Sequence, residues 1–138
     1  MKKVILSIFA VLFIASIGYS QVTTLWEKSA TAGTKPVWEA GGLTRGIGYG
    51  LVGANHRLFV ANREATLGGK QIFVYNALTG DSVTMLDVTT ITGGTYPLND
   101  VEVSTDGIIF VCNLTTNSST SAFKVYKYTA KLQHLLKQ

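Results

Sequence analysis

Two acidic residues, Asp100 and Glu102, are the most suggestive candidates for chemistry, because they lie two positions apart in a run that alternates polar and apolar residues. Alternate residues of a β-strand face the same side, about 7 Å apart. A carboxyl pair at that separation suits the acid and base roles of glycoside hydrolysis. The competing interpretation is that both carboxylates are hydrated side chains lining a channel.

Ligand binding is a second chemistry that the sequence allows, and we expect Arg45 and Asp100 to carry it. Both residues lie at strand ends or loop starts, where β-scaffolds place their binding groups. Asp100 suits a cation or a sugar hydroxyl. In the alternative interpretation, Asn99 and Asp100 cap a turn through their own backbone.

Nucleophilic and metal chemistry have little support. Cys112 is the only cysteine and lies in the apolar run 108–112, which predicts a buried, unreactive thiol. The two histidines, His56 and His134, are not grouped with it at metal-ligand spacing. No G-x-S-x-G nucleophile motif occurs in the Ser/Thr-rich segment 115–121. The sequence therefore predicts no catalytic residue, no metal site and no cofactor.

The glycine-rich run from Gly46 to Gly50 resembles a phosphate-binding loop only superficially. A dinucleotide-binding loop follows a strand and opens a helix, whereas this run leads into another β-type segment. Glycines within a strand allow another backbone to approach closely. We therefore expect Gly46, Gly48 and Gly50 to mark a close contact between strands.

The elements that must position these residues are short β-strands separated by turns, which indicates an all-β protein. Turns are predicted at Asn55-His56, Leu78–Asp81 and Thr105–Gly107, where Asn, Asp or Gly tolerates positive φ. Strands are predicted at residues 22–27, 36–39, 47–53, 57–62, 71–77, 82–88, 100–104, 108–113 and 122–128.

An internal repeat appears when the chain is shifted by 51 residues. The shift aligns Phe59-Val60 with Phe110-Val111, Asn62 with Asn113, and Val74-Tyr75 with Val125-Tyr126. The same shift superposes the predicted turn Asn55-His56 on Asp106-Gly107. A four-stranded unit of about 50 residues is the size of a β-propeller blade. We expect an incomplete leading blade at 21–42, a first full blade at 43–93 and a second blade at 94–138 that is atypical at its end. Asn62 and Asn113, at equivalent positions, are predicted to form a structural hydrogen bond in each blade.

Several motifs lie along the chain at LWEKS (25–29), TRGIGYG (44–50), RLFVANR (57–63), LTG (78–80), GGTYPLNDV (93–101) and DGIIFVCNL (106–114). Together they resemble the N-terminal blades of secreted bacterial β-propeller proteins, a largely uncharacterised group with an NHL- or YVTN-like blade pattern. The resemblance implies a partial, roughly two-blade propeller and an exported location, and it carries no catalytic residue to this chain. The pattern is lost after Tyr128, which suggests a truncated or partial member.

The first 20 residues have the pattern of a secretory signal peptide, with Lys2 and Lys3 before an apolar run at 4–17 and small residues before Gln21. Their removal takes away two lysines and no acidic residue, so the net charge falls from +4 to +2. The remaining basic residues are scattered, which argues against nucleic-acid binding. We expect a secreted, periplasmic or cell-surface protein with no membrane span after cleavage.

The predicted function is that of a non-catalytic binding or structural scaffold with an unknown protein or carbohydrate ligand. Self-association through exposed blade faces is also expected, because an open propeller fragment leaves such faces uncovered. The alternative is a fragment of a propeller hydrolase or lactonase-like enzyme.

Overall fold

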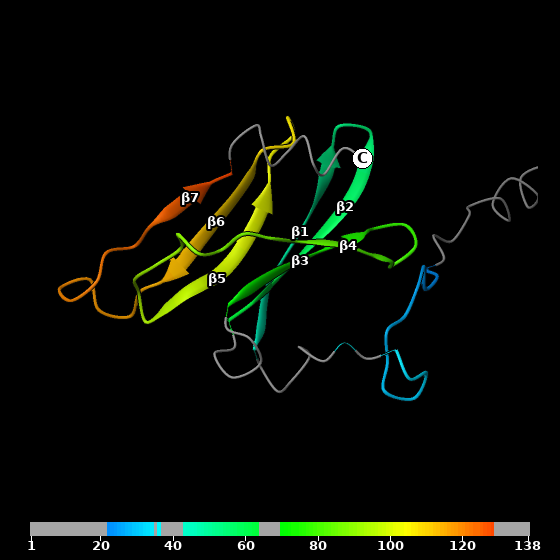
Figure 1. Ribbon diagram of the computed structural model, residues 1–138, viewed down its shortest axis with the longest axis horizontal. Coiled ribbons are helices and arrows are strands. Elements are labelled where there is room, and N and C mark those ends of the chain that lie inside the picture. The colour runs from blue at the N-terminus through cyan, green and yellow to red at the C-terminus, as the bar shows by residue number, and fades with distance from the viewer. Residues whose placement is uncertain (1–21, 35, 37–42, 64–69, 129–138) are drawn as a thin grey trace, which may run out of the picture.

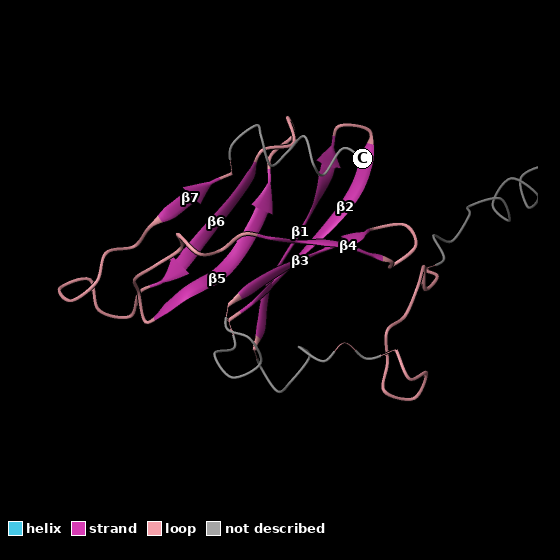
Figure 2. Cartoon of the chain, viewed as in Figure 1, coloured by secondary structure: helices cyan, strands magenta, loops and turns pink. Residues whose placement is uncertain are grey.

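The computed structural model describes residues 22–34, 36, 43–63 and 70–128, and this part of the chain is all-β (Figures 1 and 2). Two antiparallel sheets form, which we call sheet A, with the order β1-β2-β3-β4, and sheet B, with the order β5-β6-β7. The all-β prediction is confirmed. The strands are β1 (Thr44–Val52), β2 (Asn55–Asn62), β3 (Gln71–Asn76), β4 (Ser82–Leu86), β5 (Tyr96–Val103), β6 (Ile109–Leu114) and β7 (Val125–Lys127).

Each sheet is a meander in which consecutive strands pair with each other. In sheet A, Ile47 pairs with Val60, and Ala61 pairs with Ile72 on the other side of β2. In sheet B, Val101 pairs with Val111, and Cys112 pairs with Val125. The strands follow the β-branched and aromatic runs of the sequence, because such side chains pack well on a pleated surface.

The hairpin turns use glycine, and this corrects one predicted turn. Asn55 and His56 do not form a turn; they begin β2 and pair with Val52 and Leu51. The turn lies at residues 53–54, where Gly53 has φ +67°. No described residue other than glycine has positive φ, so Gly53 supplies the conformation that was assigned to Asn55.

The equivalent hairpin of sheet B has a longer loop. Val103 pairs with Ile109, so residues 104–108 form the loop, and Gly107 has φ +79°. The predicted turn at Thr105–Gly107 is confirmed, and the Gly107 amide donates to the Ser104 carbonyl at 2.9 Å. The two hairpins thus differ in loop length, so the ungapped alignment of the turns by 51 residues is wrong.

The hydrophobic core lies between the two sheets. We call the face of each sheet that lines this core its inner face and the opposite face its outer face. Sheet A contributes Phe59 and Ala61 from β2, which are 0% and 1% exposed. Sheet B contributes Ile109 and Val111 from β6, which are 0% and 1% exposed. Further core residues are Val52, Ile72, Val74, Leu86, Ile91, Leu98 and Val101.

The inner side of β1 carries glycine where it meets β5 (Figure 1). A Cβ atom added at Gly48 would lie 2.5 Å from the carbonyl oxygen of Val101, and one at Gly46 would collide with Asp100. Only glycine permits this approach of two backbones, so the predicted close contact at these positions is confirmed.

The predicted strand at residues 22–27 is wrong, because the structure assigns no strand there. Val22 and Leu25 are 98% and 67% exposed. The segment is held instead through Trp26, whose Nε1 donates to the Ala77 carbonyl at 2.8 Å and whose ring lies against Gly80. The predicted signal peptide, most of the strand at 36–39, and the final segment 129–138 lie outside the described residues.

Candidate functional site

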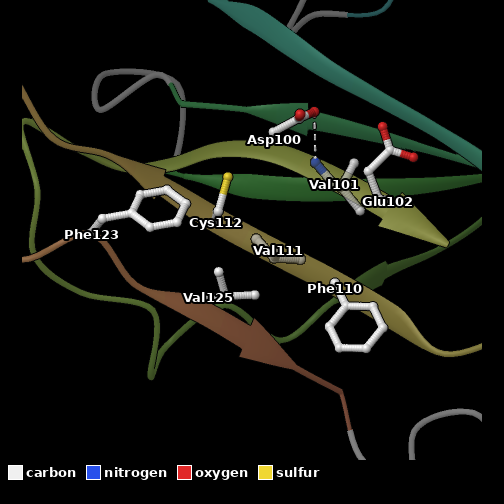
Figure 3. Close-up of a pocket in the computed structure, with 8 residues that line it drawn as sticks. All are labelled: Asp100, Val101, Glu102, Phe110, Val111, Cys112, Phe123 and Val125. Atoms are coloured by element: carbon white, nitrogen blue, oxygen red, sulfur yellow. Dashed lines mark hydrogen bonds between the residues drawn. The ribbon is translucent and has the colours of Figure 1, made fainter. Parts of the chain in front are cut away.

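Asp100 and Glu102 lie on β5 and line one shallow pocket on the outer face of sheet B (Figure 3). The prediction that both lie on one side of one strand is confirmed. Glu102 is exposed and Asp100 half-buried. The pocket has a volume of about 200 Å³, and its remaining lining residues are Val101, Phe110, Val111, Cys112, Phe123 and Val125.

The lining of this pocket favours an apolar occupant. Phe123 and Val125 are 63% and 59% exposed beside it. Asp100 Oδ1 already accepts a hydrogen bond from the Val101 amide at 2.9 Å, which agrees with the alternative that Asp100 caps its own backbone. The pocket therefore presents two carboxylates at the edge of a hydrophobic surface and offers a sugar few donors.

Cys112 lies in the same pocket on β6, half-buried rather than fully buried as predicted. Burial raises the pKa of its thiol, and the nearby Asp100 carboxylate raises it further. The thiol consequently stays protonated at neutral pH, and the protonated form is a poor nucleophile. The prediction of a weakly reactive cysteine agrees with this environment.

A second polar cluster forms at Arg63, which follows β2. Its guanidinium carbon lies 3.9 Å from the centre of the Tyr96 ring, a cation–π contact, and its Nη1 donates to Asn99 Oδ1 at 3.5 Å. Arg63 Nε and the hydroxyl of Thr44 are buried and make no hydrogen bond within the described structure. Thr44 also lines a hollow on the outer face of sheet A, so within the described residues Arg63 Nε is the unsatisfied buried atom of the Arg63 cluster.

Sequence reasoning named Arg63 and Asn99 only as residues at strand ends and missed Tyr96. The contact joins residues that are far apart in the chain, so no local sequence motif predicts it. The predicted strand began at residue 100, whereas β5 begins at Tyr96, so the sequence did not place Tyr96 and Asn99 on one strand.

Arg45 is exposed in β1 beside a bulge between Thr44 and Gly46. The next residue, Gly46, lies directly against Asp100. The structure thus places the two predicted ligand-binding residues on strands that touch, although each faces a different environment. Arg45 and Asp100 as ligand-binding residues stay a prediction.

Asn113 has the structural role that was predicted for it. Its side chain is 1% exposed, and its Nδ2 donates to the Ala122 carbonyl at 3.0 Å. Its Oδ1 accepts from the Lys124 amide at 2.9 Å. These two bonds close the loop between β6 and β7. Asn62 is also 1% exposed.

A hollow of about 320 Å³ lies on the outer face of sheet A. Trp26 and Lys28 line it from the N-terminal segment, and the Lys28 ammonium lies 5.6 Å from the centre of the Tyr75 ring. The sheet contributes Ile47, Leu58 and Val60 among other residues. Part of this outer face is therefore already covered by the chain itself.

Within the described ranges, no group of three or more His, Cys, Asp or Glu residues is arranged to hold a metal ion. The same residues include no helix that is long and apolar enough to cross a bilayer.

No family model, no curated protein and no solved structure matches this chain.

Proposed function

We propose that this protein is an exported, non-catalytic scaffold built from propeller-type blades, in which sheets A and B are two successive units. The observation that carries the proposal is that residues at equivalent positions of the repeat lie on the inner face of one sheet and on the outer face of the other. The repeat aligns Phe59-Val60 with Phe110-Val111. Phe59 lies on the inner face of sheet A, whereas its equivalent, Phe110, lines the pocket on the outer face of sheet B.

The neighbouring position shows the reverse arrangement. Val60 lines the outer hollow of sheet A, whereas its equivalent, Val111, is a core residue of sheet B. Equivalent side chains of the two sheets therefore point in the same direction. The face of sheet A that carries Phe59 packs against the face of sheet B that does not carry the equivalent residue, Phe110. Stacking of this kind is what radial repetition of blades requires, whereas a two-fold symmetric sandwich would bring equivalent faces together.

The strand pairing supports the same equivalence. Ile47 pairs with Val60 in sheet A, and Val101 pairs with Val111 in sheet B, so Ile47 and Val101 occupy corresponding places. Val101 is 1% exposed in the core, whereas Ile47 is 59% exposed. A position that is buried in one unit is uncovered in the other, as expected for units that stack in one direction.

Binding is the activity that such a scaffold supports, and the Arg63 cluster is the better equipped of the two polar regions. It offers a cation, an amide and, within the described residues, a buried atom without a hydrogen-bond partner, Arg63 Nε. These groups suit a carboxylate or hydroxyl-bearing ligand from a protein or a carbohydrate. Export rests on the signal-peptide pattern of residues 1–20, and mass spectrometry of the secreted product should find Gln21 as its first residue.

The test of a non-catalytic role is turnover of model esters, lactones and aryl glycosides by the purified chain. We expect no rate above that of buffer. Asp106→Asn is the matched control for Asp100→Asn, because Asp106 is an exposed turn residue bonded to Ser104. Turnover that disappears in Asp100→Asn and persists in Asp106→Asn would show that the protein is a hydrolase and would refute the non-catalytic role.

A further inference from the structure

Among the residues that the structure describes, none covers the outer face of sheet B as sheet B covers the equivalent face of sheet A. Under the pairing of strands, Phe110, Cys112 and Val125 correspond to Phe59, Ala61 and Ile72, so the alignment of Val74 with Val125 by 51 residues is wrong. The three residues of sheet A are at most 1% exposed, because sheet B packs on them. The corresponding residues of sheet B line the open pocket instead, and Val125 is 59% exposed (Figure 3).

The outer face of sheet A has a complementary surface. Ile47, Tyr49 and Leu51 alternate along β1 and are 59%, 55% and 46% exposed, so they form an apolar stripe. Within the chain, the equivalent residue of β5, Val101, is the one that packs against sheet A. Within the described residues, each molecule thus carries both halves of a second contact of the same kind: the outer face of sheet B and the β1 stripe are exposed, although Trp26 and Lys28 cover part of β2 and β3 beside that stripe.

We propose that the outer face of sheet B binds the β1 stripe of a second copy of this chain, so that copies join head to tail. This proposal rests on the stacking described under the proposed function. It extends an interface that the chain already makes between its own sheets, with Ile47 of the second copy in the place that Val101 takes within the chain. A head-to-tail contact is heterologous, and it therefore gives rings or filaments rather than a symmetric dimer.

Charge favours the same occupant. Asp100 and Glu102 of β5 occupy the positions that Gly46 and Gly48 occupy in β1. The strand pairing shows this, because Asp100 pairs with Cys112 as Gly46 pairs with Ala61. The free face is therefore acidic along β5. The incoming strand supplies the exposed cation Arg45. The carboxylates also prevent the close backbone approach that Gly46 and Gly48 allow, so the second copy packs mainly over β6 and β7.

The experiment mixes two chains, each with one thiol on one face. A Val125→Cys, Cys112→Ser chain carries its single thiol on the outer face of sheet B, where Val125 is 59% exposed, and an Ile47→Cys, Cys112→Ser chain carries its thiol on the β1 stripe. A short bis-maleimide should link the two chains into dimers in the mixture, at least five times more than in either chain alone. A Ser82→Cys, Cys112→Ser chain, with its thiol on exposed β4, is the matched control.

Two results would overturn the proposal: linkage in the mixture no greater than with the Ser82→Cys chain, or linkage of the Val125→Cys, Cys112→Ser chain to itself. The second result means that the same faces pair. Should Ile47→Cys fail to fold by circular dichroism, Leu51→Cys serves in its place on the same stripe. None of these outcomes bears on the turnover assay, so failure of head-to-tail binding is distinguishable from failure of the scaffold proposal.

Discussion

The contact between β1 and β5 predicts that Gly48→Ala destabilises the fold, although alanine normally favours regular structure. A Cβ atom at this position would lie 2.5 Å from the Val101 carbonyl oxygen and 3.2 Å from the Glu102 Cα atom, well inside the 3.4 Å at which ordinary contact begins. Both obstacles are backbone atoms and cannot rotate away. Relief therefore requires the two strands, and with them the two sheets, to move apart.

The magnitude follows from two opposing effects. Overpacking of this kind costs about 3 kcal/mol, at the upper end of the usual range, because backbone must shift. Alanine leaves the unfolded chain less conformational freedom than glycine, and this stabilises the folded state by about 1 kcal/mol. The net loss of about 2 kcal/mol corresponds to a fall in Tm of about 8–16 °C for a domain of this size.

Thermal and urea unfolding followed by circular dichroism measure this loss. Thr84→Ala is the control, since Thr84 is exposed on β4 and should change the free energy of unfolding by less than about 0.5 kcal/mol. A Gly48→Ala protein with a Tm equal to or above that of the wild type would refute the close approach of β1 and β5.

Three further changes test other parts of the structure. Asn113→Ala should lower the free energy of unfolding in urea by about 1–3 kcal/mol, because the backbone partners of its buried side chain would be left unpaired; an unchanged midpoint would contradict the role of Asn113. Gly80→Ala should cost about 1–3 kcal/mol, since Gly80 has φ +74° and contacts Trp26, and the near-ultraviolet signal of Trp26 should weaken; retention of both would argue against this packing. Burial raises the pKa of the Tyr128 phenol, whose hydroxyl donates to the Asp87 carbonyl at 2.8 Å. The folded state therefore holds this proton more tightly than the unfolded state, so the stabilisation is complete below the unfolded pKa of about 10 and is lost as pH rises above it. Tyr128→Phe should weaken this loss in unfolding experiments above about pH 10, and an identical pH dependence in both proteins would show that Tyr128 does not cause it.

Local patterning was enough to predict most of the strands. The core strand β2 was predicted to within two residues, because its apolar and β-branched side chains are dense and its end is marked by Asn62. The segment at 22–27 has the same composition but was mispredicted, since a strand also needs a partner for its backbone groups. The local sequence could not show that Trp26 would be anchored by a distant carbonyl.

The turn at 53–54 shows a second limit. Both Gly53 and Asn55 are turn formers, and composition alone did not decide which of them carries the positive φ. The alignment by 51 residues favoured Asn55, because it placed Asn55 opposite Asp106. The structure instead shortens one hairpin, and this changes which residue of β5 corresponds to each residue of β1.

The candidate site was predicted only in part. The shared side of Asp100 and Glu102 follows from the alternation of a strand, and the structure confirms it. The contact of Arg63 with Tyr96 depends on how two sheets meet. No periodicity within either strand encodes that relation, so it could be found only once the sheets were in place.

The row of glycines on β1 has a consequence for how the molecule opens. Where Gly46 and Gly48 face β5, main-chain atoms provide the contact, and attraction between such atoms falls off steeply over a fraction of an ångström. Partial separation of the strands would therefore lose nearly all of this contact at once. The amides of β1 and β5 should then exchange with solvent at the same rate and with the same denaturant dependence, as one cooperative unit that spans both sheets.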